Sequence, residues 1–186
     1  MLPAVLADDL FFVDTRAYAD GRLPQRGDLV VFYAPPEVTF QQPTSGKGPV
    51  FLKRIVGISG DRVRMDNGVP VVNGKPLVQE VAGEYSYGNV LPRKATLLRE
   101  RLPDGIAYDV IKLGKGRDVD NAGPFTVPAG RYFVLGNNRD DSIDSRVSLP
   151  GLGSGWTIPL ADIIGRPNYV FWSGFDRLDR IGLALK

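Results

Sequence analysis

The chain has 186 residues and a formal net charge of +2, and 43% of its residues are hydrophobic. These values are typical of a folded globular protein, and the weak charge without a long basic run argues against a nucleic-acid partner. The sequence contains no cysteine and no histidine, which excludes disulfides, a thiol nucleophile, a Ser-His-Asp triad and the usual zinc and copper ligand sets. If the protein is an enzyme, its general base is a lysine, an aspartate, a glutamate or a tyrosine.

Most of the chain has the pattern of β-strands separated by turns. The 22 glycines and 15 prolines interrupt the sequence every few residues, and runs rich in β-branched and aromatic residues lie between them. The predicted strands are, in chain order, "DLVVFYAP" (28–35), "VFLKRIVGI" (50–58), "GRYFVLG" (130–136) and "NYVFWSGF" (168–175). A helix of about two turns at most is expected in "PLADIIG" (159–165). We therefore predict a mostly β protein with little helix.

Three short pairs predict tight hairpins in the middle of the chain. Asn67-Gly68 and Asn73-Gly74 flank the short strand "VPVV", and Asp104-Gly105 comes before "IAYDVIKL". Asn-Gly and Asp-Gly are typical of two-residue hairpin loops because both residues tolerate positive φ. Pro70 lies within "VPVV" and has no N–H group, so this strand is expected at the edge of a sheet.

Residues 65–130 differ from the flanking segments by their dense mixture of charges, as in "LPRKATLLRERLPDG" (91–105). We interpret these charges as the solvated faces of hairpins. The segments on either side are more apolar and richer in predicted strands. The sequence therefore predicts a core formed by residues 1–64 and 131–186, interrupted by an inserted β-rich hairpin subdomain at 65–130.

The aromatic run "YVFWSGF" (169–175) allows two interpretations. We expect a core strand, and the alternative is contact with a membrane interface, where tryptophan and tyrosine are favoured. No stretch of the sequence reaches the roughly 18 apolar residues that a membrane-spanning helix requires.

The segment "FLKRIVGISGD" (51–61) carries a lysine and an arginine among apolar residues. Because side chains alternate along a strand, Lys53 shares a face with Phe51 and Ile55, whereas Arg54 lies on the other face. A buried guanidinium keeps its proton and needs a partner, but a buried lysine can lower its pKa. Lys53 is therefore a candidate general base, for which its pKa must fall by roughly 3 units. The alternative is a lysine that reaches solvent at a sheet edge or pairs with a carboxylate.

The polar segment "GNNRDDSIDSR" (136–146) follows a predicted buried strand and must be held by its own hydrogen bonds. Asp144 and Arg146 can form a bidentate pair, and the Ser142 hydroxyl can bind a neighbouring amine. A calcium loop using Asp140, Asp141 and Asp144 is one alternative, although the ligand spacing and the turn glycine of an EF-hand are missing. A purely structural loop is the other.

Taken in order along nearly the whole chain, these segments resemble the type I (leader) signal peptidases. "MLPAVLADDLFFV" resembles the segment just after the nucleophile of that family, and "RGDLVVF" resembles the strand that follows it. "LKRIVGISGDRV" resembles the lysine strand, and "GNNRDDSIDSR" resembles the second signature loop. "VNGKPL" and "IIGRP" also fit. The resemblance implies a signal-peptidase-like β core with an inserted β-hairpin subdomain.

The resemblance also implies roles for single residues. Lys53 matches the buried, neutral lysine that acts as general base in the serine-lysine dyad of the family. Ser142 matches the serine that hydrogen-bonds to this lysine and orients it. Asp144 and Arg146 match the pair that holds the loop beside the dyad. Neither a metal nor an organic cofactor is implied.

Met1 and Leu52 match positions of the family that line a shallow pocket for small side chains. Such a pocket favours alanine at the first and third positions before the cut. The implied substrates are the signal peptides of exported preproteins. The implied partners are the membrane surface and the protein export machinery, with no nucleic acid.

Two departures from the family pattern stand out. The nucleophilic serine of the family precedes the position that Met1 matches, so this chain contains the base without the nucleophile, and we predict that it is inactive as given. Ser45 and Ser59 are poor substitutes, because Ser45 lies in the loop "PTSGKGP" and Ser59 stands where the family often has proline. Asn137 stands where the family usually has aspartate.

The resemblance thus predicts a membrane-associated serine endopeptidase, whose catalytic domain lies on the non-cytoplasmic (periplasmic) side of the inner or plasma membrane and whose anchor is outside this chain. A specialised processing peptidase of a conjugation or pilus system is an alternative within the family. A non-catalytic β-rich module that binds extended peptides along a sheet edge is an alternative from another class.

Overall fold

The computed structural model describes residues 1–39, 47–88, 91–114 and 116–185. The described chain is mostly β, as the sequence predicts, and its helical segments are four short 3-10 turns. These turns are η1 (Pro36–Val38), η2 (Asp118–Asp120), η3 (Leu160–Asp162) and η4 (Leu178–Arg180).

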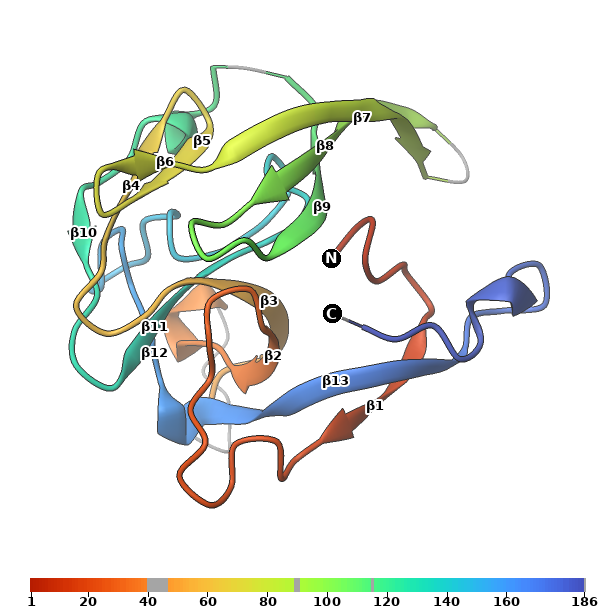
Figure 1. The fold of residues 1–186 in the computed structure, drawn as a ribbon, viewed down its shortest axis with the longest axis horizontal. Coiled ribbons are helices and arrows are strands. Elements are labelled where there is room, and N and C mark those ends of the chain that lie inside the picture. Colours follow the sequence, from red (N-terminus) through yellow and green to blue (C-terminus); the bar gives the residue numbers. More distant parts are fainter. Residues whose placement is uncertain (40–46, 89–90, 115, 186) are drawn as a thin grey trace.

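A six-stranded sheet forms the lower part of the molecule as drawn in Figure 1. Its neighbouring strands are all antiparallel. In spatial order, the strands are β1 (Leu10–Asp14), β13 (Ile163–Trp172), β2 (Leu29–Tyr33), β3 (Val50–Gly57), β11 (Arg131–Leu135) and β12 (Ile158–Pro159). The β-branched and aromatic runs predicted as strands supply β2, β3, β11 and the second half of β13.

Two smaller antiparallel sheets lie above this sheet in Figure 1. One has four strands, in the order β10 (Phe125–Thr126), β4 (Arg62–Asp66), β5 (Val69–Val72) and β6 (Lys75–Pro76). The other has three long strands, in the order β7 (Val78–Tyr87), β8 (Arg93–Arg101) and β9 (Ala107–Lys112).

The predicted turns between these strands are confirmed. Asn67-Gly68 joins β4 to β5, and Asn73-Gly74 joins β5 to β6. All four of these residues have positive φ, as a tight hairpin of this type requires. Asp104-Gly105 lies in the connection between β8 and β9, residues 102–106, so the predicted hairpin is present with a loop longer than two residues.

The helical piece expected in 159–165, of two turns at most, is the single 3-10 turn η3, because β13 begins at Ile163 and extends the backbone. One expectation about local structure is wrong. Pro70 does not mark a sheet edge, since β5 lies between β4 and β6. The pairing with β6 involves only the two residues after Pro70, so the missing N–H group of Pro70 interrupts no bond to that strand.

The core consists of three clusters of buried apolar side chains. The largest joins strands on both sides of the predicted boundaries: Val63, Met65, Val72 and Val110 pack there with Phe133. The predicted core and the predicted insertion at 65–130 therefore share one apolar interior. The boundaries between them stay a prediction. In the part of the chain that the structure describes, no helix has the length and apolarity needed to cross a membrane.

Candidate active site

Lys53 and Ser142, which are 89 residues apart in the sequence, meet at one side of the six-stranded sheet. Lys53 lies in the middle of β3, paired with Val30 of β2. Its Nζ donates a hydrogen bond of 2.9 Å to Oγ of Ser142. The same Nζ lies 5.2 Å from the centre of the Phe51 ring, so an aromatic face covers part of the amine. The structure thus brings the two residues together in the arrangement expected from the sequence.

The surroundings of Lys53 disfavour its charged form. Burial lowers the pKa of the Lys53 amine below its ordinary value, and it outweighs the neighbouring Asp144 carboxylate, which raises the pKa. The Arg146 guanidinium lowers the pKa further. The direction of the shift is the one that a lysine needs to act as a base.

Arg54, the other charge on β3, has the partners that a buried guanidinium needs. The side chain is 2% exposed. Its Nη1 donates to the carbonyl oxygen of Gly27 at 2.6 Å, and its Nε donates to Oδ1 of Asn137 at 3.1 Å. The guanidinium also lies 4.1 Å from the centre of the Tyr108 ring. Burial lowers the pKa of Arg54 to about 10, so the group stays charged at neutral pH. Arg54 is therefore held in the interior by fixed partners.

The loop of residues 136–146 is fixed by the predicted Asp144–Arg146 pair. Arg146 donates from Nε to Oδ1 of Asp144 at 2.8 Å and from Nη2 to Oδ2 at 2.7 Å, with both side chains fully buried. The backbone N–H of Gly136 also donates to Oδ2 of Asp144, at 3.0 Å. Burial raises the pKa of Asp144, but Arg146 and these hydrogen bonds hold it below its usual value. The carboxylate therefore closes the loop on itself, with Ser142 between its ends.

Gly136 allows the close approach of Ser142 to β11. A Cβ atom built on Gly136 would lie 2.1 Å from Oγ of Ser142 and 2.5 Å from its Cβ. These distances are far below van der Waals contact. Only glycine at this position lets the hydroxyl of Ser142 lie where Lys53 reaches it.

A second buried ion pair, which the sequence analysis missed, ties the loop to the three-stranded sheet. Arg139 donates from Nη1 and Nη2 to the two carboxylate oxygens of Glu100 on β8, and both residues are buried. Tyr108 donates to the same carboxylate at 2.7 Å. The carbonyl oxygen of Arg139 accepts from Nη2 of Arg146 at 2.6 Å, which links the two pairs.

The interpretation of residues 91–105 as solvated hairpin charges is therefore wrong for Glu100, although Arg93, Lys94, Arg99 and Arg101 are exposed. The alternation of side chains along β8 indicates that Glu100 is buried, because Glu100 shares its face of the strand with the partly buried Leu98. A charge at a position that the alternation buries calls for a buried partner of opposite sign.

Met1 and Leu52, the predicted pocket residues, pack against the same apolar cluster, which is formed by Val5, Leu29, Val170 and Leu185. The Met1 amino group lies in the field of Lys53: burial first, and then the Lys53 charge, lower the pKa of this amino group to about 6. The beginning of the chain therefore lies beside the candidate base.

The segment that carries Met1 is held in place by Asp9. The Asp9 carboxylate accepts hydrogen bonds from the Leu6 backbone at 2.8 Å, from the Ser173 hydroxyl and from the Arg180 guanidinium. Arg180 also donates to the carbonyl oxygen of Ala4 at 3.2 Å. The C-terminal segment thus fixes residues 4–9 next to the site.

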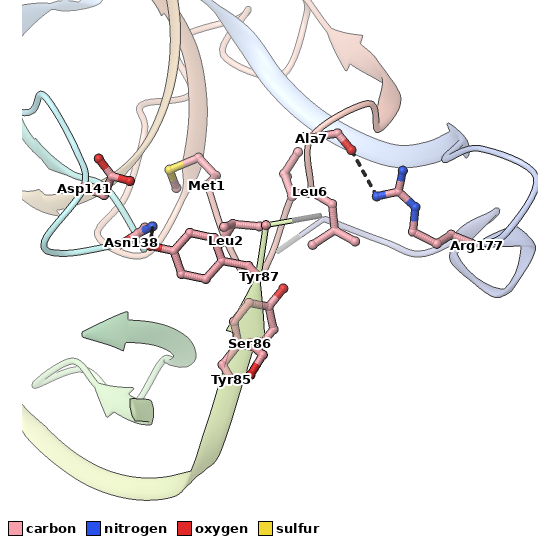
Figure 2. A pocket seen from close by; sticks show the side chains of 12 residues that line it. Met1, Leu2, Leu6, Ala7, Tyr85, Ser86, Tyr87, Asn138, Asp141 and Arg177 are labelled. Atoms are coloured by element: carbon pink, nitrogen blue, oxygen red, sulfur yellow. Dashed lines mark hydrogen bonds between the residues drawn. The ribbon is translucent and has the colours of Figure 1, made fainter. Parts of the chain in front are cut away.

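A cavity of about 680 Å³ opens beside Met1. Figure 2 shows Met1, Asn138 and Asp141 at one end of this cavity, Arg177 at the other, and Tyr85 and Tyr87 along one side. Leu52 is not among the described residues that line it. The cavity therefore adjoins the Met1 side of the site.

The carboxylates proposed for a calcium loop have separate partners. Asp140 accepts from the backbone N–H groups of Leu113 and Gly114, and Asp141 pairs with Arg93 at 2.9 Å. Among the described residues, no group of three or more acidic side chains is arranged to hold a metal ion.

The two serines considered as substitutes for the nucleophile give no support to that role. Ser59 is exposed, and its hydroxyl accepts a hydrogen bond of 2.8 Å from the Gly130 backbone. Ser45 lies outside the described residues.

Comparison with known proteins matches residues 1–172 to the family described as signal peptidase, peptidase S26. The chain is 32% identical over 158 residues to a signal peptidase I of Rickettsia typhi, which covers 82% of this chain and 53% of that protein. It is 31% identical over 174 residues to a signal peptidase I of Rickettsia canadensis, with 88% and 59% covered.

A crystal structure of a signal peptidase I from Enterococcus faecalis V583 aligns with a TM-score of 0.42 at 21% identity, covering 77% of this chain and 96% of that one. The chain spans between about half and three fifths of the length of the two Rickettsia relatives.

Proposed function

Because the chain belongs to the signal peptidase family, peptidase S26, we propose that it forms the catalytic part of a serine endopeptidase that removes signal peptides from exported preproteins. The observation that carries this proposal is the 2.9 Å hydrogen bond from Nζ of Lys53 to Ser142, at an amine whose pKa burial lowers. The absence of histidine and cysteine from the sequence is consistent with a base of this kind.

In the proposed mechanism, neutral Lys53 takes the proton from a serine hydroxyl as its oxygen attacks the carbonyl carbon of the scissile peptide bond. The protonated Nζ then gives this proton to the departing amine nitrogen, and water hydrolyses the acyl-enzyme with Lys53 again as base. Ser142 orients Nζ, and the Asp144–Arg146 pair positions Ser142. These roles assign Lys53 as the catalytic residue of this chain and the other three as positioning residues.

The proposed nucleophile is a serine immediately before Met1. This position is supported by the location of the Met1 amino group, which lies close enough to Lys53 for the lysine charge to lower its pKa. A residue joined to that nitrogen would therefore lie in the neighbourhood of Lys53. Without this serine, we expect the chain as printed to cleave nothing.

Met1 and Leu52 are proposed to line the pocket for the small side chains before the cut. Both side chains are half-buried, and both pack on the apolar cluster of Val5 and Leu29. We propose that the exposed parts of these two side chains form a shallow pocket, which alanine fits and whose walls a larger side chain would overlap. Export machinery is the proposed source of the substrates.

An exposed aromatic surface supports the proposed association with a membrane, for which the non-cytoplasmic side is proposed from the resemblance alone. On β1 and β13, Phe12, Tyr169 and Phe171 are 41–50% exposed, and the Phe12 ring lies 4.6 Å from that of Phe171 and 5.2 Å from that of Tyr169. Phe175, just after β13, is 87% exposed. Aromatic side chains gathered on a surface in this way suit the interfacial region of a bilayer.

The test compares the chain as printed with the same chain carrying Gly-Ser before Met1. Each is incubated in detergent with a peptide that contains an Ala-X-Ala junction. We expect the extended chain to cleave the peptide. We expect Lys53→Ala to abolish this cleavage and Lys75→Ala to retain it. Lys75 is a matched control because it is an exposed lysine on β6. Equal cleavage by the Lys53→Ala version would contradict the proposed role of Lys53.

A further inference from the structure

The cavity beside Met1 has one unpartnered polar atom at the end formed by Asn138. Asn138 is 7% exposed and donates from Nδ2 to the Tyr87 hydroxyl at 3.2 Å, which fixes its side-chain amide. Its Oδ1 is buried and has no hydrogen-bond partner within the described structure. At the other end, Nη1 of Arg177 donates to the carbonyl oxygen of Ala7 at 3.2 Å, and its Nε lies 3.6 Å from Oδ1 of Asp176 in an ion pair. An unpaired buried polar group is costly, so Oδ1 of Asn138 calls for a donor.

Two tyrosines on the inner face of β7 form one side of the cavity. Tyr85 and Tyr87 lie two residues apart on this strand, half-buried, with their ring centres separated by 6.3 Å. The neighbouring residues Glu84 and Ser86 are exposed, as strand alternation requires. The tyrosines, whose rings are tilted by 36° to each other, therefore present an aromatic surface across from Met1, Leu2 and Leu6 (Figure 2).

The lining suits an extended, hydrophilic polypeptide. The volume of about 680 Å³ lies within the common range for ligand sites, ~300–1,000 Å³. An extended peptide offers N–H groups and carbonyl oxygens in alternation, and its N–H groups match the acceptor at Asn138. The charged side chains of Asp141 and Arg177 and the tyrosine hydroxyls add polar groups to a lining that also contains Met1, Leu2 and Leu6. This mixed lining suits the beginning of a mature protein better than the wholly apolar core of a signal peptide.

We propose that this cavity binds the part of the substrate that follows the cut, the beginning of the mature protein. This inference rests on the proposed function and names a second contact region for the same substrate. The chain that leaves the reaction centre beside Met1 would pass between Tyr87 and Leu2. One of its first backbone N–H groups would donate to Oδ1 of Asn138.

The experiment measures peptide binding by fluorescence anisotropy to the chain as printed, which needs no nucleophile. Two labelled peptides share one Ala-X-Ala junction and its preceding residues; one continues with a single mature-side residue and the other with six hydrophilic ones. We expect the long peptide to bind about tenfold more tightly, as a few added contacts give. The variant Tyr85→Ala is expected to reduce this ratio to less than about twofold.

The matched control is Val81→Ala, a truncation on the same strand at a side chain that is 76% exposed. It is expected to keep the full ratio. Circular dichroism of both variants separates a local effect from a loss of folding, and Asn138→Ala provides a second, independent variant expected to lower the ratio.

The outcomes separate this inference from the proposed function. If the short peptide binds and the six added residues change its affinity by less than about twofold, the cavity is not a mature-side site, although the proposed function stands. The same conclusion follows if folded Tyr85→Ala and Asn138→Ala keep the full ratio. If neither peptide binds any version of the chain, and the Gly-Ser-extended chain cleaves nothing, both the inference and the proposed function are overturned.

Discussion

Replacement of Glu100 by glutamine tests whether the buried ion pair with Arg139 anchors the candidate active-site loop. Glu100→Gln keeps the size and shape of the side chain but removes its charge. Arg139 is fully buried and donates to both carboxylate oxygens of Glu100. The guanidinium cannot lose its proton, so the variant leaves a positive charge in the interior without its main counter-charge. We expect this variant to be strongly destabilised.

The magnitude follows from the burial of both partners. Breaking a buried pair by neutralising one member costs about 3–5 kcal/mol in free energy of unfolding, against a total of ~5–15 kcal/mol for a typical domain. Urea unfolding followed by tryptophan fluorescence at pH 7 measures this loss directly. Glu84→Gln, on the exposed face of β7, is the matched control and is expected to change the free energy of unfolding by less than about 0.5 kcal/mol.

The pH dependence gives a second readout. Burial raises the pKa of Glu100, but Arg139, Gln79 and Tyr108 hold it below the ordinary value of 4.5. A carboxylate whose pKa is lower in the folded state contributes stability above its unfolded pKa and loses it as the pH falls through the folded pKa. Glu100→Gln should therefore weaken the loss of stability below about pH 4.5. A variant as stable as the parent at pH 7, with an unchanged acid profile, would refute this account of the loop.

Three further predictions concern the site and the membrane surface. In the Gly-Ser-extended chain, Gly136→Ala should lower kcat/KM by about 10²-fold, because its Cβ would lie 2.1 Å from the Ser142 hydroxyl. Gly114→Ala is the control and should have no effect on kcat/KM, because the space around Gly114 is open. Equal kcat/KM values for the two variants would contradict the close approach of Ser142 to Gly136. Ser142→Ala should lower kcat/KM by at least about tenfold with little change in KM, because Nζ of Lys53 loses its fixed partner; unchanged kcat would rule out the orienting role. Phe12→Ser should reduce co-sedimentation with anionic vesicles, and binding equal to the parent would argue against the aromatic surface.

The local structure of this protein follows closely from its sequence, because its signals are short in range. Asn67-Gly68 and Asn73-Gly74 specify their own turns through positive φ, and β-branched runs specify the strands beside them. Pro70 shows the limit of this reasoning. The effect of Pro70 depends on how many residues of β5 pair with β6. A local sequence pattern does not contain this information.

The candidate site is predictable only in part, because long-range pairing decides it. The two-sided apolar pattern around Lys53 indicates burial, but only the fold brings Ser142 to its amine. The pairing of Glu100 with Arg139 across 39 residues was missed, since both lie in segments dense with charges. Burial of one charge in a strand predicts a partner of opposite sign without identifying it. The cavity beside Met1 depends on four segments far apart in the sequence and has no signal in any of them.

The proposed mechanism depends most directly on a neutral Lys53. Its pKa can be measured in the chain as printed by ¹³C NMR of labelled lysine side chains, with Lys53→Met used to assign the resonance. We expect Lys53 to titrate clearly below the ordinary lysine value of ~10.4. We expect its pKa to shift back toward that value in Gly136→Ala, because this variant loosens Ser142 and the surrounding loop. Titration of Lys53 at or above the ordinary value would contradict its role as the base.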